Sequence, residues 1–160
     1  MKFIKIILII FISINTSVKA DSKKNLIQNL KEGGKLIFIR HAYAPGGGDP
    51  ENFNINDCAT QRNLSVGGRI QSKKIGYFFR ENQIKIKKIY SSEWCRCKET
   101  ASLAFGTFET KNFLNSFFSS NFAHNKKRQI IDFKKFLINW DKKTNLIFVT
   151  HYVVIAELLG

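Results

Sequence analysis

Two short apolar runs, each leading into polar residues that include a histidine, constrain the fold of this chain most strongly. The first, Leu-Ile-Phe-Ile, lies in a strand expected over 35–40 and leads into Arg40-His41. The second, Leu-Ile-Phe-Val, lies in a strand expected over 145–150 and leads into His151. Continuous apolar runs of this length are typical of strands buried on both faces, as in a parallel sheet covered by helices. The chain is therefore expected to form an α/β domain.

The segments between these strands alternate as such a sheet requires. Apolar residues at helical spacing predict helices over 25–31, 65–82, 93–105, 128–141 and 153–159. A further short strand is expected over 88–91, and the aperiodic segments 42–63 and 112–125 are expected to be loops. In the helix over 65–82, Ser65 is the expected N-cap. The inner face of that helix is expected to carry Ile70, Ile75, Phe78 and Phe79.

The first 20 residues have the pattern of a secretory signal peptide. Lys2 and Lys5 flank an apolar run over 6–14, and Val-Lys-Ala at 18–20 closes the segment. The run is shorter than the roughly 20 residues that cross a bilayer. We therefore expect a signal peptide over 1–20 and a single domain over 21–160, exported to a bacterial periplasm without a stable membrane span after cleavage. An uncleaved membrane anchor is the alternative.

The chain is strongly basic, with 26 Lys and Arg against 12 Asp and Glu, and should attract anions. The lysines are scattered over polar helix faces and loops, which is typical of a solvated surface. No nucleic-acid-binding motif and no basic stripe with interleaved aromatic residues occurs in the sequence. Nucleic acid is therefore not an expected partner, and an anion-binding surface protein is kept only as an alternative.

Three cysteines allow at most one internal disulfide. Cys95 and Cys97 point to different sides of a helix, so they are not expected to bond to each other. Cys58 lies in the long loop and could bond to either of them, which would pin that loop. No CxxC pair or compact histidine cluster is present, so no zinc site is expected.

Polar residues follow three of the expected strands at the point where each strand ends. They are Arg40-His41, the Ser91-Ser92 pair leading to Arg96, and Thr150-His151. Ligands of open α/β sheets bind beyond the carboxyl ends of the strands, where parallel neighbours would bring two arginines and two histidines together. Arginine forks match phosphate oxygens, and a neutral imidazole can attack phosphorus. Each residue alone has an ordinary structural explanation, but their joint placement predicts a phosphoryl-transfer site that needs no metal or other cofactor.

Four motifs resemble those of the histidine phosphatase superfamily, in the family's order and spacing between residues 35 and 160. They are IRHA at 39–42, QRNLSVGGR at 61–69, SSEWCRCKETA at 91–101 and VTH at 149–151. The resemblance, which suggests a small exported bacterial phosphatase, implies a three-layer phosphoglycerate mutase-like fold with a mostly parallel sheet and helices on both faces. Family members generally continue into another strand after the last helix expected here, so that strand is expected to be missing.

The resemblance also implies a phosphohistidine mechanism. His41 matches the family's nucleophile and Arg40 the arginine beside it, while Arg96 and His151 match the second arginine and second histidine of the phosphate pocket. Arg62 matches a further basic contact near that pocket. The implied reaction is transfer of a phosphoryl group to His41, followed by attack of water on the phosphoenzyme.

The general acid is left open by the sequence. Asp49 in the glycine-rich loop is the first candidate and Glu93 the second, and a turn role before Pro50 is the alternative for Asp49. A good leaving group, such as that of phosphohistidine or an acyl phosphate, would need no acid. The substrate is expected to be a phosphorylated small molecule or a phosphoprotein. The sequence determines neither which one nor the oligomeric state.

The expected function is thus that of an exported, metal-independent phosphatase. A binding protein that kept the phosphate pocket but lost catalysis is the first alternative. A phosphoglycerate mutase-type phosphotransferase is the second. Ala42 follows His41 where mutases usually have glycine, which weakens that second alternative.

Overall fold

A computed structural model describes residues 14–160 as a parallel four-stranded sheet in the order β1-β4-β2-β3. The strands are β1 Leu36–Arg40, β2 Lys88–Ser91, β3 Glu109–Thr110 and β4 Leu146–Thr150. The two apolar runs pair with each other, with Ile37 opposite Ile147. The prediction of a parallel α/β sheet is therefore confirmed. Strand β3 was not predicted from the sequence, because two residues carry no periodic signal.

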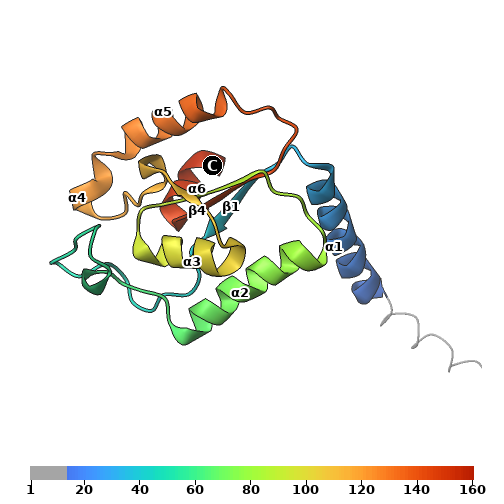
Figure 1. Ribbon diagram of the computed structural model, residues 1–160, viewed down its shortest axis with the longest axis horizontal. Coiled ribbons are helices and arrows are strands. Elements are labelled where there is room, and N and C mark those ends of the chain that lie inside the picture. Colours follow the sequence, from blue (N-terminus) through green and yellow to red (C-terminus); the bar gives the residue numbers. More distant parts are fainter. Residues whose placement is uncertain (1–13) are drawn as a thin grey trace, which may run out of the picture.

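Helices cover both faces of this sheet (Figure 1). They are α1 Ile14–Glu32, α2 Val66–Glu81, α3 Cys95–Phe105, α4 Ser120–Ala123, α5 Lys126–Leu137 and α6 Tyr152–Leu159, with short 3-10 helices η1 Cys58–Thr60 and η2 Asn112–Leu114. In Figure 1, α2 and α3 lie on one side of the sheet and α5 on the other. This is the layered arrangement expected from the motif resemblance.

Strand β4 is the centre of the hydrophobic core, and all five of its residues are buried. Ile147 and Val149 pack in a cluster with residues of α1, α2 and α3. Leu146 and Phe148 point the other way and pack with α5 and η2. Successive side chains of a strand face opposite sides of the sheet, so burial on both sides requires an unbroken apolar run. Each such side chain contributes about 1.5–3 kcal/mol when it is fully buried.

The buried face of α2 differs from the expected one. Phe79 is buried as expected, but Ile70 is 50% exposed. The other buried positions carry Gly68, Ser72 and Gly76, because α2 and the chain around it approach closely there. A Cβ atom added at Gly76 would collide with a backbone carbonyl of α3. The buried face of α2 is therefore set by small residues, which a search for apolar residues at helical spacing does not find.

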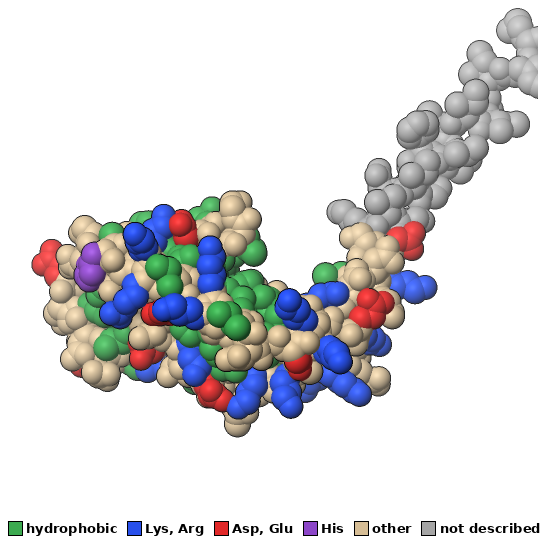
Figure 2. All heavy atoms as spheres, turned by 90° about the horizontal axis from the view of Figure 1, so that it is seen from above, with side chains coloured by type: hydrophobic (Ala, Val, Ile, Leu, Met, Phe, Trp, Pro, Cys, Tyr) green, Lys and Arg blue, Asp and Glu red, His purple; other side chains and the backbone are tan. Residues whose placement is uncertain are grey.

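The N-cap expected for α2 is confirmed, because the Ser65 hydroxyl accepts a hydrogen bond from the Gly68 amide at 3.1 Å. The expected signal peptide lies mostly outside the described residues, so it stays a prediction. Of the helices in the described part of the chain, none combines the length and the apolar character needed to cross a membrane. Figure 2 shows Lys and Arg side chains spread over the visible face and not gathered in one stripe.

Candidate active site

The carboxyl ends of β1, β2 and β4 meet at one edge of the sheet, next to a cavity of about 640 Å³. The cavity is lined by six of the site residues expected from the sequence, namely Arg40, His41, Asp49, Arg62, Arg96 and His151. The second candidate acid, Glu93, is not among the lining residues, and its carboxylate accepts a hydrogen bond from Asn115 at 2.6 Å. The structure therefore brings together the residues that follow the three strands, without Glu93.

His41 is a buried, neutral imidazole with its Nε2 atom directed at an arginine. Its Nδ1 atom lies 2.9 Å from the carbonyl oxygen of Ala42, so Nδ1 carries the proton and donates it. Nε2 therefore has a free electron pair, which accepts a hydrogen bond from Nε of Arg96 at 3.3 Å. Burial, together with the positive charges of the surrounding arginines, lowers the pKa of His41 to about 4. The ring can consequently act as a nucleophile at neutral pH.

The position of His41 follows from how β1 ends. The His41 amide donates to the carbonyl oxygen of Thr150 at 2.9 Å, which extends the pairing of β1 with β4. The Ala42 amide then donates to the hydroxyl of Thr100 at 3.0 Å, and that hydroxyl donates to the Arg96 carbonyl oxygen at 2.7 Å. The nucleophile is thereby tied to the strand beside it and to the helix that carries Arg96.

Arg96 lies in the first turn of α3 and is only 3% exposed. Its Nη1 and Nη2 atoms donate to the two carboxylate oxygens of Asp49 at 2.7 and 3.1 Å. Asp49 also accepts from the indole N–H of Trp94 at 3.0 Å and from the Arg62 amide at 3.1 Å. Asp49 therefore holds one edge of the guanidinium, and the Nε edge faces His41.

These contacts bear on the role expected for Asp49. Burial by itself would raise the pKa of Asp49, but the hydrogen bonds and charge of Arg96 and the N–H groups of Arg62 and Trp94 outweigh it and hold that pKa below its ordinary value. Asp49 is consequently ionised and has no proton to donate in this arrangement. Its surroundings favour a counter-ion for Arg96 over a general acid.

His151 lies beside His41, with the two ring centroids 5.4 Å apart, and is 4% exposed. Its Nε2 atom lies 3.0 Å from the hydroxyl oxygen of Ser92 and 3.5 Å from the sulfur of Cys97. Burial, and then the charge of Arg96, lower the pKa of His151 well below its ordinary value. His151 is therefore neutral, with its Nδ1 atom left for a ligand.

The sequence did not identify what orients His151. The hydroxyl of Ser92 also donates to the side-chain oxygen of Asn115 at 3.0 Å. Ser92 follows β2 directly, so its place after a strand was a usable signal. Asn115 lies in a segment without any period and carries no signal at all.

Arg62 lines the cavity and carries one side-chain N–H group without a partner. Its Nη1 atom donates to the carbonyl oxygens of Ala44 and Gly46 at 2.5 and 2.9 Å. Its Nε atom, by contrast, is the one buried side-chain N or O atom in the described part of the chain that lacks a hydrogen-bond partner. A buried, unpaired N–H is costly, so an anion that reaches it would gain a hydrogen bond at little further cost. Arg40 is exposed at the end of β1 and lines the same cavity.

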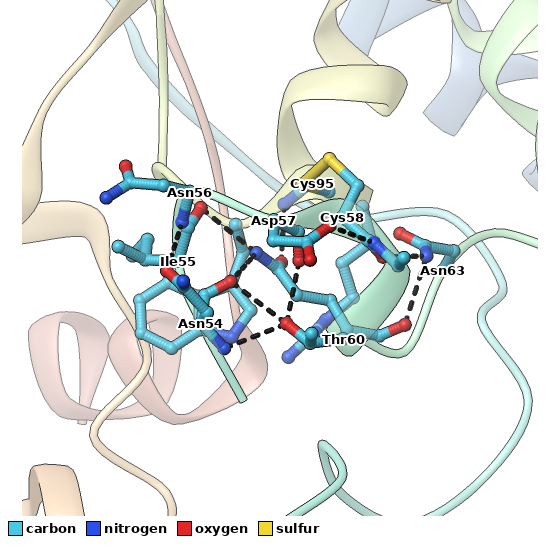
Figure 3. The surroundings of a disulfide bond; sticks show 12 residues. Asn54, Ile55, Asn56, Asp57, Cys58, Thr60, Asn63 and Cys95 are labelled. Carbon is cyan, nitrogen blue, oxygen red and sulfur yellow. Dashed lines mark hydrogen bonds between the residues drawn. A yellow bond between two sulfur atoms is a disulfide. The ribbon is translucent and has the colours of Figure 1, made fainter. Parts of the chain in front are cut away.

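A disulfide between Cys58 and Cys95 ties the long loop to α3, one residue before Arg96 (Figure 3). The structure thus selects between the two partners that the sequence left open, and Cys97 is a free, buried thiol. Nearby, the side-chain oxygen of Gln61 accepts from the Cys95 amide at 2.9 Å. The loop that carries Asp49 and Arg62 is therefore held to α3 both covalently and by hydrogen bonds.

Comparison with known proteins finds similar structures but no similar sequence. No protein-family model matches the chain, and no curated protein matches it. A proposed alpha-ribazole-5'-P phosphatase from Escherichia coli has a TM-score of 0.57 at 15% identity, over 78% of this chain and 76% of the other. The protein histidine phosphatase SixA, complexed with tungstate, has a TM-score of 0.53 at 12% identity, over 78% and 73%. A mycobacterial glucosyl-3-phosphoglycerate phosphatase, complexed with VO3, has a TM-score of 0.54 at 14% identity, over 77% and 78%.

These neighbours are members of the histidine phosphatase superfamily, and the chain shares their phosphoglycerate mutase-like α/β fold. The fold implied by the motif resemblance is therefore confirmed. At identities this low the likeness establishes the fold alone, because one fold supports many functions. The chemistry has to be argued from the residues of the cavity.

Proposed function

We propose that this protein is a metal-independent phosphatase that hydrolyses phosphoric monoesters through a phosphohistidine on His41. One observation carries the proposal. The unprotonated Nε2 atom of a buried, neutral His41 lies 3.3 Å from Nε of the buried Arg96, inside a cavity also lined by Arg40 and Arg62. A nucleophile and three guanidinium groups thus surround a space that a phosphate dianion could occupy.

In the proposed first step, the electron pair of His41 Nε2 forms a bond to phosphorus, and the bond between phosphorus and the leaving oxygen breaks. The leaving oxygen takes the electron pair of that bond and then a proton from solvent water. Donors on Arg40, Arg96 and Arg62 stabilise the charge on the three remaining phosphoryl oxygens.

In the second step, water attacks the phosphorus atom and the bond to His41 Nε2 breaks. The electron pair returns to Nε2, the water loses a proton to solvent, and inorganic phosphate leaves. The proton stays on His41 Nδ1 throughout, hydrogen-bonded to the Ala42 carbonyl oxygen. His151 can donate from Nδ1 to a phosphoryl oxygen once the Ser92 hydroxyl proton turns from the Asn115 side-chain oxygen to His151 Nε2.

We further propose that the protein acts after export, with residues 1–20 as the signal peptide and 21–160 as the mature domain. The Cys58–Cys95 disulfide supports this location, because such bonds persist in the periplasm and other oxidising compartments and are rare in the cytosol. The neighbour SixA is a protein histidine phosphatase. Phosphoproteins are accordingly among the substrates to test, together with small phosphate esters.

The test is phosphate release from an aryl phosphate by the purified protein, with and without a chelator. His41→Ala should abolish release, whereas His124→Ala should leave it unchanged because His124 is exposed and lies outside the cavity. Brief reaction with labelled substrate followed by quenching should trap an acid-labile phosphoryl group on the wild type. Chelator-sensitive release, or release that survives loss of His41, would refute the mechanism.

The same assay separates the phosphatase from a protein that only binds phosphate. Such a binder would be stabilised against heat by phosphate yet would release none from any ester. Measuring thermal stabilisation by inorganic phosphate for the wild type and for Arg96→Ala therefore accompanies the kinetic assay.

A further inference from the structure

The cavity that contains His41 has an aromatic part as well as a basic one. Phe53 and Trp94 stack with ring centroids 5.0 Å apart, and Phe122 meets both rings edge-on at 5.5 Å. These three rings line the cavity. They support one another and need no ligand to explain them.

Two further aromatic residues in the cavity are not explained by packing. Phe118 lies in the segment between η2 and α4, and Tyr152 begins α6 directly after His151. Both line the cavity, yet they are 69% and 65% exposed. Within the described residues, neither ring stacks on another aromatic ring, so neither gains the stabilisation that a packed ring gives. Exposed apolar surface that lines a concave site is typical of ligand binding.

The cavity is also larger than a phosphate group needs. Its volume of about 640 Å³ falls within the range of roughly 300–1,000 Å³ that holds whole drug-sized ligands. The phosphoryl group takes the part lined by His41 and the arginines. The rest of the volume is left for the organic group of the substrate, and Phe118 and Tyr152 are among the residues that line the cavity.

The carboxyl groups of the cavity bear on the nature of the leaving group. Asp49 is held ionised by Arg96, and Glu51 is exposed. Asp49 therefore has no proton to give to a leaving group, and Glu51 does not lie in the buried, apolar setting typical of catalytic acids. A phenol, with a pKa of about 10, leaves as an anion far more readily than an alcohol, whose pKa is near that of water at roughly 16. The site is thus better suited to an aromatic leaving group than to an aliphatic one.

We infer that the substrates are aryl phosphate monoesters, the class that includes phosphotyrosine, and that Phe118 and Tyr152 contact the aromatic ring. The inference rests on the proposed phosphatase function and adds the substrate class to it. Phe118 and Tyr152 then determine specificity, while His41 and the arginines act on the phosphoryl group that all phosphate monoesters share. A nucleoside monophosphate also carries a flat ring, but its leaving group is an aliphatic alkoxide.

The test measures binding of two non-hydrolysable probes, phenylphosphonate and cyclohexylphosphonate, by calorimetry. Both present a phosphonate and a six-membered ring of similar size, but only the first is aromatic. The wild type should bind phenylphosphonate about three- to tenfold more tightly, as expected for one or two aromatic contacts. Phe118→Leu and Tyr152→Leu should each reduce this preference, and the double variant should remove it.

Two controls show whether the effect belongs to the cavity. Tyr77→Leu replaces a ring that is 58% exposed on α2, outside the cavity, and should leave the preference unchanged. Affinity for inorganic phosphate should be the same in the wild type and in all of these variants, because Phe118 and Tyr152 do not bind the phosphoryl group.

A kinetic comparison tests the leaving group. Turnover of phenyl phosphate should exceed that of adenosine 5'-monophosphate.

The outcomes separate this inference from the proposed function. Equal binding of the two probes by a protein that releases phosphate would refute the aromatic specificity and leave the phosphatase standing. A preference that survives in the double variant would also refute it, as would faster turnover of the nucleotide. Absence of phosphate release from every ester would instead refute the proposed function.

Discussion

Loss of the Cys58–Cys95 disulfide should destabilise the protein mainly through its unfolded state. The bond joins residues 37 positions apart. Closing a loop of this length removes chain entropy from the unfolded state that corresponds to about 4 kcal/mol at 25 °C. Cys58→Ser removes the bond at its exposed end and leaves the hydrogen bonds of the loop in place. We therefore expect the free energy of unfolding to fall by about 2–4 kcal/mol, the range typical of native disulfides.

The assay is urea unfolding followed by tryptophan fluorescence, with and without a reductant. Reductant should lower the unfolding midpoint of the wild type to that of Cys58→Ser, and it should not change the variant. Cys97→Ala serves as the matched control, because Cys97 is a free thiol and its loss should leave the reductant effect intact. A thiol titration of the unfolded, unreduced wild type should find one reactive group. Three reactive thiols, or a wild type that reductant does not destabilise, would refute the reasoning.

Four further outcomes are expected. Asn145→Ala should lower the free energy of unfolding by about 3 kcal/mol or more in urea titrations, because this buried side chain makes three hydrogen bonds to backbone groups. Gly76→Ala should cost about 1–3 kcal/mol in the same assay, since its methyl group would collide with the backbone of α3. Asp49→Asn should lower kcat/KM by a similar factor for good and poor leaving groups, whereas loss of a general acid would slow poor leaving groups more. Because the pKa of His41 is lowered to about 4 in the folded protein, the unfolded chain binds a proton between pH 6.5 and about 4 while the folded protein does not. The free energy of unfolding should therefore fall by about 3 kcal/mol as the pH drops through that window. Urea titrations at pH 7.5 and 4.5 should show a smaller fall for His41→Gln.

Much of the fold was predictable because the strands of the sheet carry continuous apolar runs. The runs around Phe38 and Phe148 are apolar at every position, which only a strand covered on both sides requires. The close contact at Gly76 was not predictable, because a glycine face has no hydrophobic signal and depends on where α3 passes. Without that signal, the apolar spacing predicts that Ile70 is buried, but Ile70 is half exposed.

The residues of the candidate site were predictable from the sequence, but the hydrogen bonds between them were not. His41 and His151 each follow a strand directly, and Arg96 lies in the first turn of the helix after β2. The carboxyl ends of parallel strands lie at one edge of the sheet, so these residues were expected to meet there. The pairing of Asp49 with Arg96 depends on how a loop folds back over 47 positions of sequence. The local sequence around Asp49 fits an acid, a turn and a counter-ion equally well.

The sequence by itself determined the parallel sheet, the order of its helices and the gathering of two histidines and two arginines at its edge. These features depend on local periodicity and on the ends of strands, both of which are properties of short segments. Tertiary structure alone decided that Cys58 bonds to Cys95, that Asp49 is held ionised by Arg96, and that the Nε–H of Arg62 is left without a partner. Those outcomes depend on distances between segments far apart in the chain, which follow from the packing of the whole domain.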